Sequence, residues 1–182
     1  MTQIPLFQPP SEWTPPERLP DLSDAKEIAI DLETYDPNIK ETGPGWAVGN
    51  GYIAGIAIAV EGWKGYFPIR HEGGGNFDER ILKKQVQRIM DLPCDKIFHN
   101  ASYDVGWLRW WGVEVKGKII DTLIAAPLID ENRFRYDLNS LSWHYLGYGK
   151  NEAALAEAAE EWGIDPKSEM YKLPAMLSLI HI

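Results

Sequence analysis

Two acidic residues, Asp31 and Glu33, are separated by one residue in a segment that reads Ile-Ala-Ile-Asp-Leu-Glu-Thr over positions 28–34. The apolar run ahead of them predicts a buried strand over residues 26–31, and alternate side chains of a strand point to the same face. The two carboxylates should therefore project side by side, where they repel unless protons or cations neutralise them. Oxygen ligands of this kind favour Mg²⁺ or Mn²⁺. The pair predicts metal-dependent phosphate chemistry.

A third acid, Asp104, ends the segment His-Asn-Ala-Ser-Tyr-Asp at positions 99–104, which also follows a short apolar strand. An isolated Asp-X-Glu often occurs by chance at the solvated end of a strand, so it indicates a functional site only together with other features. The upstream strand, the Thr34 that follows directly and the matching setting of Asp104 favour a shared site over a solvated loop.

Composition restricts the class of protein. With 182 residues and 45% hydrophobic residues, including 8 Trp and 8 Tyr, the chain fits one folded domain. The single cysteine, Cys94, excludes an internal disulfide framework, and neither a membrane span nor a signal peptide is visible, so we expect a cytoplasmic protein. The net charge of −9 argues against gripping long nucleic acid through the overall field, although bound metal ions would reverse the local sign.

The order of elements predicts an α/β fold. Residues 1–25 are a proline-rich arm, and residues 34–51 read as a Gly-rich loop placed for substrate contacts. Strands are predicted over 26–31, 52–60, 64–69, 96–99 and 118–121, and helices over 77–92, 103–111, 122–129, 138–146 and 151–162. This gives a mixed sheet of about five strands, the first three antiparallel, flanked by helices, with ligands at the carboxyl ends of the strands.

The two acidic segments resemble motifs of a known family. Asp31–Thr34 resembles the first motif, and His99–Asp104 the second, of the DEDD (DnaQ-like) 3′–5′ exonucleases, particularly the proofreading domains of family A DNA polymerases from phages and bacteria. The Asp-Thr segment at Asp121 is similar to one that follows the second motif in those domains. The resemblance covers residues 26–176 and implies a ribonuclease H-like fold.

The resemblance also implies a role for each motif residue. Asp31 would bridge two Mg²⁺ or Mn²⁺ ions, Glu33 would bind the ion that activates water, and Asp104 would hold the ion that stabilises the leaving 3′ oxygen. The implied contacts to the terminal nucleotide come from Thr34, Asn100 and Tyr103. The implied partners are a single-stranded or frayed 3′ end of DNA and a polymerase domain in the same full-length chain.

Several of these residues have a structural alternative. The Tyr103 ring could instead pack under its helix, and His99 more simply fills a strand end, since no second His lies at ligand spacing. Asp121 suits the N-cap of the helix at 122–129. The tryptophans at 107, 110 and 111 favour core and helix packing over base stacking.

One expected motif has no match in the 182 residues. The family carries Tyr-X-X-X-Asp on a helix, but Tyr171 is followed four residues later by Ala175, and no acid comes after it. Residues 177–182 can be back-translated as a transposase end used for sequencing libraries, so we expect them to be a non-native, adapter-derived tail. We expect residues 26–176 to form an exonuclease domain that lacks its third motif and is weakly active or inactive.

Three other functions remain open from the residues. An RNA-trimming 3′–5′ exonuclease of the same superfamily would share the metal site, and a non-catalytic nucleic-acid-binding module would share the surface without the hydrolysis. An aspartate-nucleophile phosphatase is disfavoured, because that chemistry normally places Asp at the position of Glu33.

Overall fold

A computed structural model describes residues 19–149, 152–165 and 169–173 of the protein. The strands are β1 (Glu27–Tyr35), β2 (Tyr52–Val60), β3 (Trp63–Pro68), β4 (Asp95–Phe98) and β5 (Ile119–Asp121). The helices are α1 (Ile39–Thr42), α2 (Gly45–Val48), α3 (Glu79–Met90), α4 (Ala101–Trp110), α5 (Thr122–Ile129), α6 (Leu138–Leu146), α7 (Glu152–Trp162) and the 3-10 turn η1 (Met170–Lys172). Most of the proline-rich arm and the suspected tail at 177–182 lie outside the described residues.

The five strands form one mixed sheet in the order β3-β2-β1-β4-β5. β1 pairs antiparallel with β2, and β2 with β3, whereas β4 runs parallel to β1 and β5 parallel to β4. The predicted α/β sheet, with its first three strands antiparallel, is confirmed. β1 therefore lies in the middle of the sheet, with its carboxyl end on the same side as those of β4 and β5.

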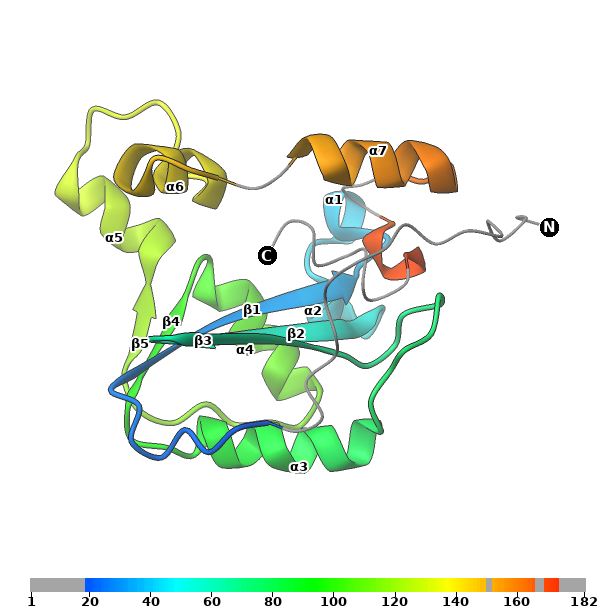
Figure 1. Ribbon diagram of the computed structural model, residues 1–182, viewed down its shortest axis with the longest axis horizontal. Coiled ribbons are helices and arrows are strands. Elements are labelled where there is room, and N and C mark those ends of the chain that lie inside the picture. Colours follow the sequence, from blue (N-terminus) through cyan, green and yellow to red (C-terminus); the bar gives the residue numbers. More distant parts are fainter. Residues whose placement is uncertain (1–18, 150–151, 166–168, 174–182) are drawn as a thin grey trace.

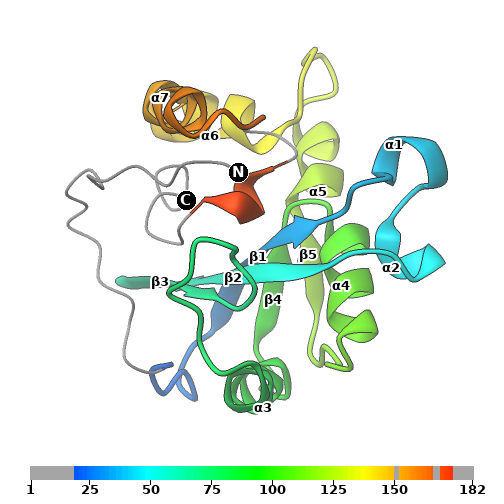
Figure 2. The same ribbon diagram turned by 90° about the vertical axis from the view of Figure 1, so that its right-hand side faces the viewer.

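Helices cover both faces of this sheet (Figures 1 and 2). α3 lies against one face, and its buried Leu82, Val86 and Met90 join the core beneath the sheet. α6 and α7 lie on the opposite side of the sheet, and η1 approaches β1 there. Asp78 begins α3 by accepting hydrogen bonds from the N–H groups of Arg80 and Ile81, as expected of an N-cap.

In the part of the chain that the structure describes, one lysine is buried in the core. The Lys96 side chain is fully buried on β4, and its ammonium donates to the carbonyl oxygens of Leu92, Cys94 and Lys116 at 2.7, 3.0 and 3.1 Å. Three carbonyl acceptors satisfy the three donors of an ammonium group, which is the condition for tolerating a buried charge. This bond set ties the loop after α3 to the start of β4.

The segment at 34–51 differs from the loop that we predicted. β1 continues to Tyr35, and the remainder contains the one-turn helices α1 and α2. Both helices are too short to show a periodic apolar pattern, so contacts with the rest of the fold must stabilise them. None of the helices in the described ranges has the length and apolar character needed to cross a bilayer.

Candidate active site

β1 separates the acids from the core by simple alternation. Ile28, Ile30 and Leu32 are buried on the face that packs on α3, while Asp31 and Glu33 are half-buried on the opposite face. The predicted shared face of the two acids is therefore present.

A β-bulge shapes β2 directly beside these acids. Asp31 pairs with Ala57 and Glu33 with Gly55, but Thr34 pairs with Ile53. Ala54 is therefore an extra residue on β2, opposite the junction of Glu33 and Thr34. Bulges of this kind bend a strand and re-aim its neighbours, and they are frequent next to functional sites.

Asp104 reaches β1 from α4. The pairing between β1 and β4 ends at Ala29 and Ile97, and further along the strand the Asp104 carboxyl accepts a hydrogen bond from the backbone N–H of Leu32. The Asp104 side chain is only 3% exposed. The structure thus brings Asp104 against the peptide between the two strand acids, as the two motifs predict.

Burial, together with the negative charges of Asp31 and, more weakly, Asp121, raises the pKa of Asp104 to about 8, against the opposing Leu32 hydrogen bond. Crowding of like charges in a poorly hydrated place favours the protonated acid unless a cation is present. The chemical character of Asp31 and Asp104 therefore suits a hard divalent cation.

Glu33 stands apart from this close pair. Within the residues that the structure describes, no three Asp, Glu, His or Cys side chains converge closely enough to hold a metal ion. Asp31 interacts with Asp104, while the Glu33 carboxylate acts electrostatically on His71.

Asp121 connects the starts of α4 and α5. Its carboxylate accepts hydrogen bonds from the N–H groups of Asn100, Ala101 and Leu123 at 2.9, 2.8 and 2.9 Å. The predicted N-cap role toward α5 is confirmed, and the same side chain also caps the start of α4. Asn100 adopts a left-handed backbone conformation with φ of 76°, which asparagine tolerates better than most residues.

Tyr103 and Thr34, both predicted to contact substrate, are bonded to each other. The Tyr103 hydroxyl lies 2.8 Å from the Thr34 hydroxyl and donates to Asp36 Oδ2 at 3.0 Å. Asp36 Oδ2 also accepts from the Gly45 N–H at 2.9 Å, at the start of α2. This network fastens the segment at 36–51 beside the acids, so Tyr103 is more than a ring packed under its helix.

The remaining predicted alternatives have clear outcomes. His99 Nδ1 lies 2.9 Å from the Thr122 hydroxyl, a packing role at the strand end. Trp107 is fully buried, whereas Trp110 is 53% exposed, and Trp111 donates to Glu79. The tryptophans are thus mainly packing residues, with Trp110 at the surface.

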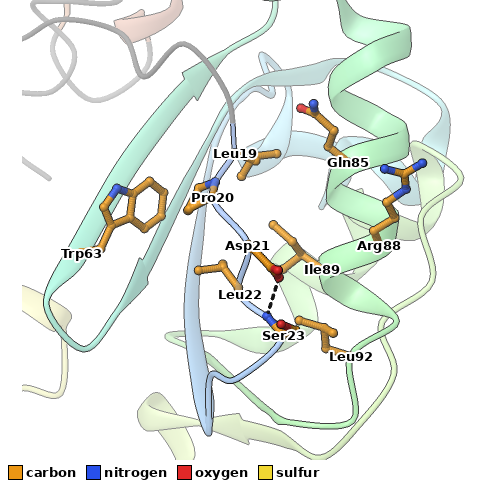
Figure 3. Close-up of a pocket in the computed structure, with 10 residues that line it drawn as sticks. All are labelled: Leu19, Pro20, Asp21, Leu22, Ser23, Trp63, Gln85, Arg88, Ile89 and Leu92. Atoms are coloured by element: carbon orange, nitrogen blue, oxygen red, sulfur yellow. Dashed lines mark hydrogen bonds between the residues drawn. The ribbon is translucent and has the colours of Figure 1, made fainter.

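A cavity of about 670 Å³ lies away from the acids, between residues 19–23, Trp63 and α3 (Figure 3). Apolar side chains dominate its lining, and Asp21 within it accepts a hydrogen bond from the Ser23 N–H. This pocket contains no cluster of acids and does not extend to the motif residues.

Sequence reasoning missed three polar residues around the site: Asp36, Tyr66 and His71. The hydroxyl of Tyr66 lies 2.6 Å from His71 Nε2, and both side chains are buried. A signal was available, since a tyrosine and a histidine flank the apolar strand end in Tyr-Phe-Pro-Ile-Arg-His at 66–71.

Comparison with known proteins decides the family. A family model described as a 3′–5′ exonuclease matches residues 15–175. The chain belongs to the 3′–5′ exonuclease domains of family A DNA polymerases. This exonuclease domain is 40% identical over 181 residues to a DNA-directed DNA polymerase of Pseudomonas phage M6. The match includes 95% of the chain but 27% of that relative, so the chain spans about a quarter of the relative's length.

Solved structures confirm the fold of the exonuclease domain. Brucella melitensis NrnC with bound Mg²⁺ is 20% identical, with a TM-score of 0.51, over 71% of this chain and 58% of its own. The catalytic core of RRP6 from Trypanosoma brucei is 18% identical, with a TM-score of 0.53, over 88% of this chain and 38% of its own. The ribonuclease H-like arrangement that we predicted is therefore present.

Proposed function

We propose that residues 26–176 are a metal-dependent exonuclease domain that hydrolyses the terminal phosphodiester at the 3′ end of DNA. The observation that carries this proposal is the approach of Asp104 to Asp31 at the end of β1, where mutual repulsion and burial raise the pKa of Asp104 to about 8. A divalent cation would neutralise two carboxylates held this close together.

The motif residues divide the work. Asp31, Glu33 and Asp104 would hold the cations at the end of β1, and Glu33 would also orient the attacking water. When bound, Mg²⁺ or Mn²⁺ supplies a nucleophilic hydroxide and stabilises the leaving 3′ oxygen, in the general scheme with two ions. The Mg²⁺ bound to NrnC, a protein of the same fold, supports magnesium as the cation.

Substrate contacts come from the corners that flank the acids. Asn100 stands exposed at the start of α4, and Thr34 ends the acid motif on β1. Tyr103 fastens the segment at 36–51 and would fix the position of the terminal nucleotide. The proposed substrate is a single-stranded or frayed 3′ end of DNA.

We infer DNA rather than RNA as the substrate, because the phage relative is named a DNA-directed DNA polymerase. The same relationship supports a polymerase domain in the full-length protein and proofreading as its role. The cytoplasm suits this activity, and the single Cys94 demands no oxidising compartment.

The decisive experiment follows single-nucleotide release from a labelled single-stranded DNA, with an RNA oligomer of the same sequence in parallel. We expect slow, Mn²⁺-dependent shortening from the 3′ end, abolished by EDTA and by Asp31→Ala. The rate should be low, because the 182 residues contain no Tyr-X-X-X-Asp to position the water.

Two outcomes would overturn the proposal. Equal shortening by the Asp31→Ala variant would show a contaminating nuclease, and binding of DNA without any metal-dependent hydrolysis would indicate a non-catalytic module. Faster shortening of RNA than DNA would instead assign the domain to RNA trimming.

A further inference from the structure

A buried polar pair lies on the acid-bearing face of the sheet. Tyr66 on β3 is fully buried, and its hydroxyl lies 2.6 Å from Nε2 of His71, which is 3% exposed. On the other side of the ring, His71 Nδ1 lies 3.0 Å from the carbonyl oxygen of Leu173. Buried polar groups are costly unless they are hydrogen-bonded, and His71 has a partner at each ring nitrogen.

Strand register places this pair beside Glu33. Asp31, Ala57 and Tyr66 form one row across the three antiparallel strands, and Glu33 and Gly55 belong to the next row on the same face. Residues directly opposite in a sheet share a face, so Tyr66 projects on the side of the two acids.

Gly55 shows how far the Tyr66 side chain reaches. A Cβ atom at Gly55 would lie 2.0 Å from the Tyr66 hydroxyl oxygen, so only glycine leaves room for it. Gly55 is the direct partner of Glu33 in the sheet, so the Tyr66 hydroxyl lies over Gly55, next to Glu33. The ring and hydroxyl of Tyr66 thus border the space that the Glu33 carboxylate uses.

The β-bulge and a loop clamp hold His71 in this place. The carbonyl oxygen of Ala54, the extra residue of the bulge, accepts hydrogen bonds from the N–H groups of Ile69 and Arg70 at 2.8 and 3.0 Å. Asn76 then bonds both the N–H and the carbonyl oxygen of His71, at 2.8 and 2.9 Å. The ring of His71 is therefore fixed by its own backbone as well as by its two ring partners.

The hydrogen bonds determine the tautomer. The Leu173 carbonyl oxygen can only accept, so Nδ1 carries the proton and donates. Burial lowers the pKa of His71, while the Leu173 bond and the charge of Glu33 oppose that fall. In the neutral ring Nε2 accepts from the Tyr66 hydroxyl, which fixes the hydroxyl's orientation. The electrostatic effect of Glu33 on this ring agrees with the place of Glu33 in the strand register.

We propose that Tyr66 and His71 are positioning residues that hold the Glu33 carboxylate for a divalent cation, with the hydrogen bond from Tyr66 to His71 Nε2 as the essential link. This inference rests on the proposed function, because it concerns the same metal site. Neither residue is proposed to bind the ion. Each would act by limiting the position and orientation of the Glu33 carboxylate. Outer partners of this kind change metal affinity by roughly 10- to 100-fold when they are removed.

The test measures Mn²⁺ binding to the metal-free chain through the electron paramagnetic resonance signal of free Mn²⁺, together with thermal unfolding. Tyr66→Phe removes the hydroxyl and keeps the ring. His71→Asn places an amide donor near the Nδ1 position and loses the link to Tyr66, whereas His71→Gln places an amide oxygen near the Nε2 position and can accept from Tyr66. Tyr136→Phe is the matched control, since its hydroxyl donates to the Asp130 carbonyl oxygen instead.

We expect Mn²⁺ affinity to fall about tenfold or more in Tyr66→Phe and His71→Asn, and to stay within about threefold in His71→Gln and Tyr136→Phe. A purely structural pair would lower the unfolding temperature in both His71 variants without separating their Mn²⁺ affinities. Equal affinities of the two His71 variants, or an unchanged affinity of Tyr66→Phe, would overturn the inference while leaving the proposed function intact. If the unsubstituted chain shows no Mn²⁺ binding that Asp31→Ala removes, the proposed function fails and the inference with it.

Discussion

The Asp104 carboxyl accepts a hydrogen bond from the backbone N–H of Leu32, the residue between the two acids of β1. This bond holds Asp104 of α4 beside the peptide between Asp31 and Glu33, although α4 lies far from β1 in the sequence. A carboxyl in this position is buried and repelled, so it is poised between holding a proton and holding a cation.

Asp104→Asn should stabilise the metal-free protein near neutral pH. The pKa of Asp104 is about 8 in the folded protein and near 3.8 when unfolded, so only the folded state keeps the proton between these values. The free energy of unfolding therefore falls as pH rises from about 4 to about 8, and asparagine removes this loss. Thermal unfolding of both proteins at pH 5, 6.5 and 8 should show a gap that widens with pH, on the order of 1 kcal/mol or more at pH 8. A constant gap would contradict the assigned pKa.

Mn²⁺ affinity should rise with pH. The cation needs the ionised form of Asp104, whose pKa of about 8 means that binding must displace a proton at neutral pH. We expect affinity to increase at least about tenfold from pH 6 to pH 8, with release of close to one proton in an unbuffered titration at pH 7. Asp104→Asn supplies the control, because it should bind weakly at every pH. A flat profile for the unsubstituted chain would show that Asp104 is not a ligand.

Asp121→Ala should destabilise the protein by about 2–4 kcal/mol, since three N–H groups at the starts of α4 and α5 lose their acceptor. Asp137→Ala is the matched control. Asp137 caps only α6, through the N–H of Ser140, and its other bonds to the Ser140 hydroxyl and Arg135 are local, so its loss should cost about 1 kcal/mol. Urea unfolding of the two variants provides the comparison, and equal losses would refute the double capping role.

Tyr103→Phe should loosen the segment at 36–51 more than the rest of the fold. The hydroxyl bonds Thr34 and Asp36, and Asp36 in turn accepts the Gly45 N–H. We expect a stability loss of about 1 kcal/mol and faster amide hydrogen exchange confined to residues 36–51. Weaker binding of single-stranded DNA should accompany it. Unchanged exchange in that segment would show that the network does not hold it.

The sequence predicted the parts of the site that depend on local order. Alternation along β1 placed Asp31 and Glu33 on one face, and the Asp-Thr pair at Asp121 indicated a helix cap. These features need only the neighbours of each residue, and both appear in the structure.

Contacts between distant segments were not predictable in the same way. The bond from Asp121 to the N–H groups of Asn100 and Ala101 joins two corners some 20 residues apart. The meeting of Tyr66 and His71 near Glu33 depends on a bulge at Ala54, for which the strand shows no periodic signal. The one-turn helices α1 and α2 likewise depend on tertiary contacts, including Trp46 packed against Gly106.

The Asp121 carboxylate accepts a hydrogen bond from the N–H of Asn100, which has a left-handed backbone conformation. Asp121 also adds negative potential at Asp104. A residue whose direct partners are backbone amides thereby influences how strongly a cation is attracted. A substitution at position 121 would therefore change both the start of α4 and the electrostatic potential at Asp104. In a domain of this architecture, the affinity for a metal ion can therefore change through substitution of a residue that does not bind the metal.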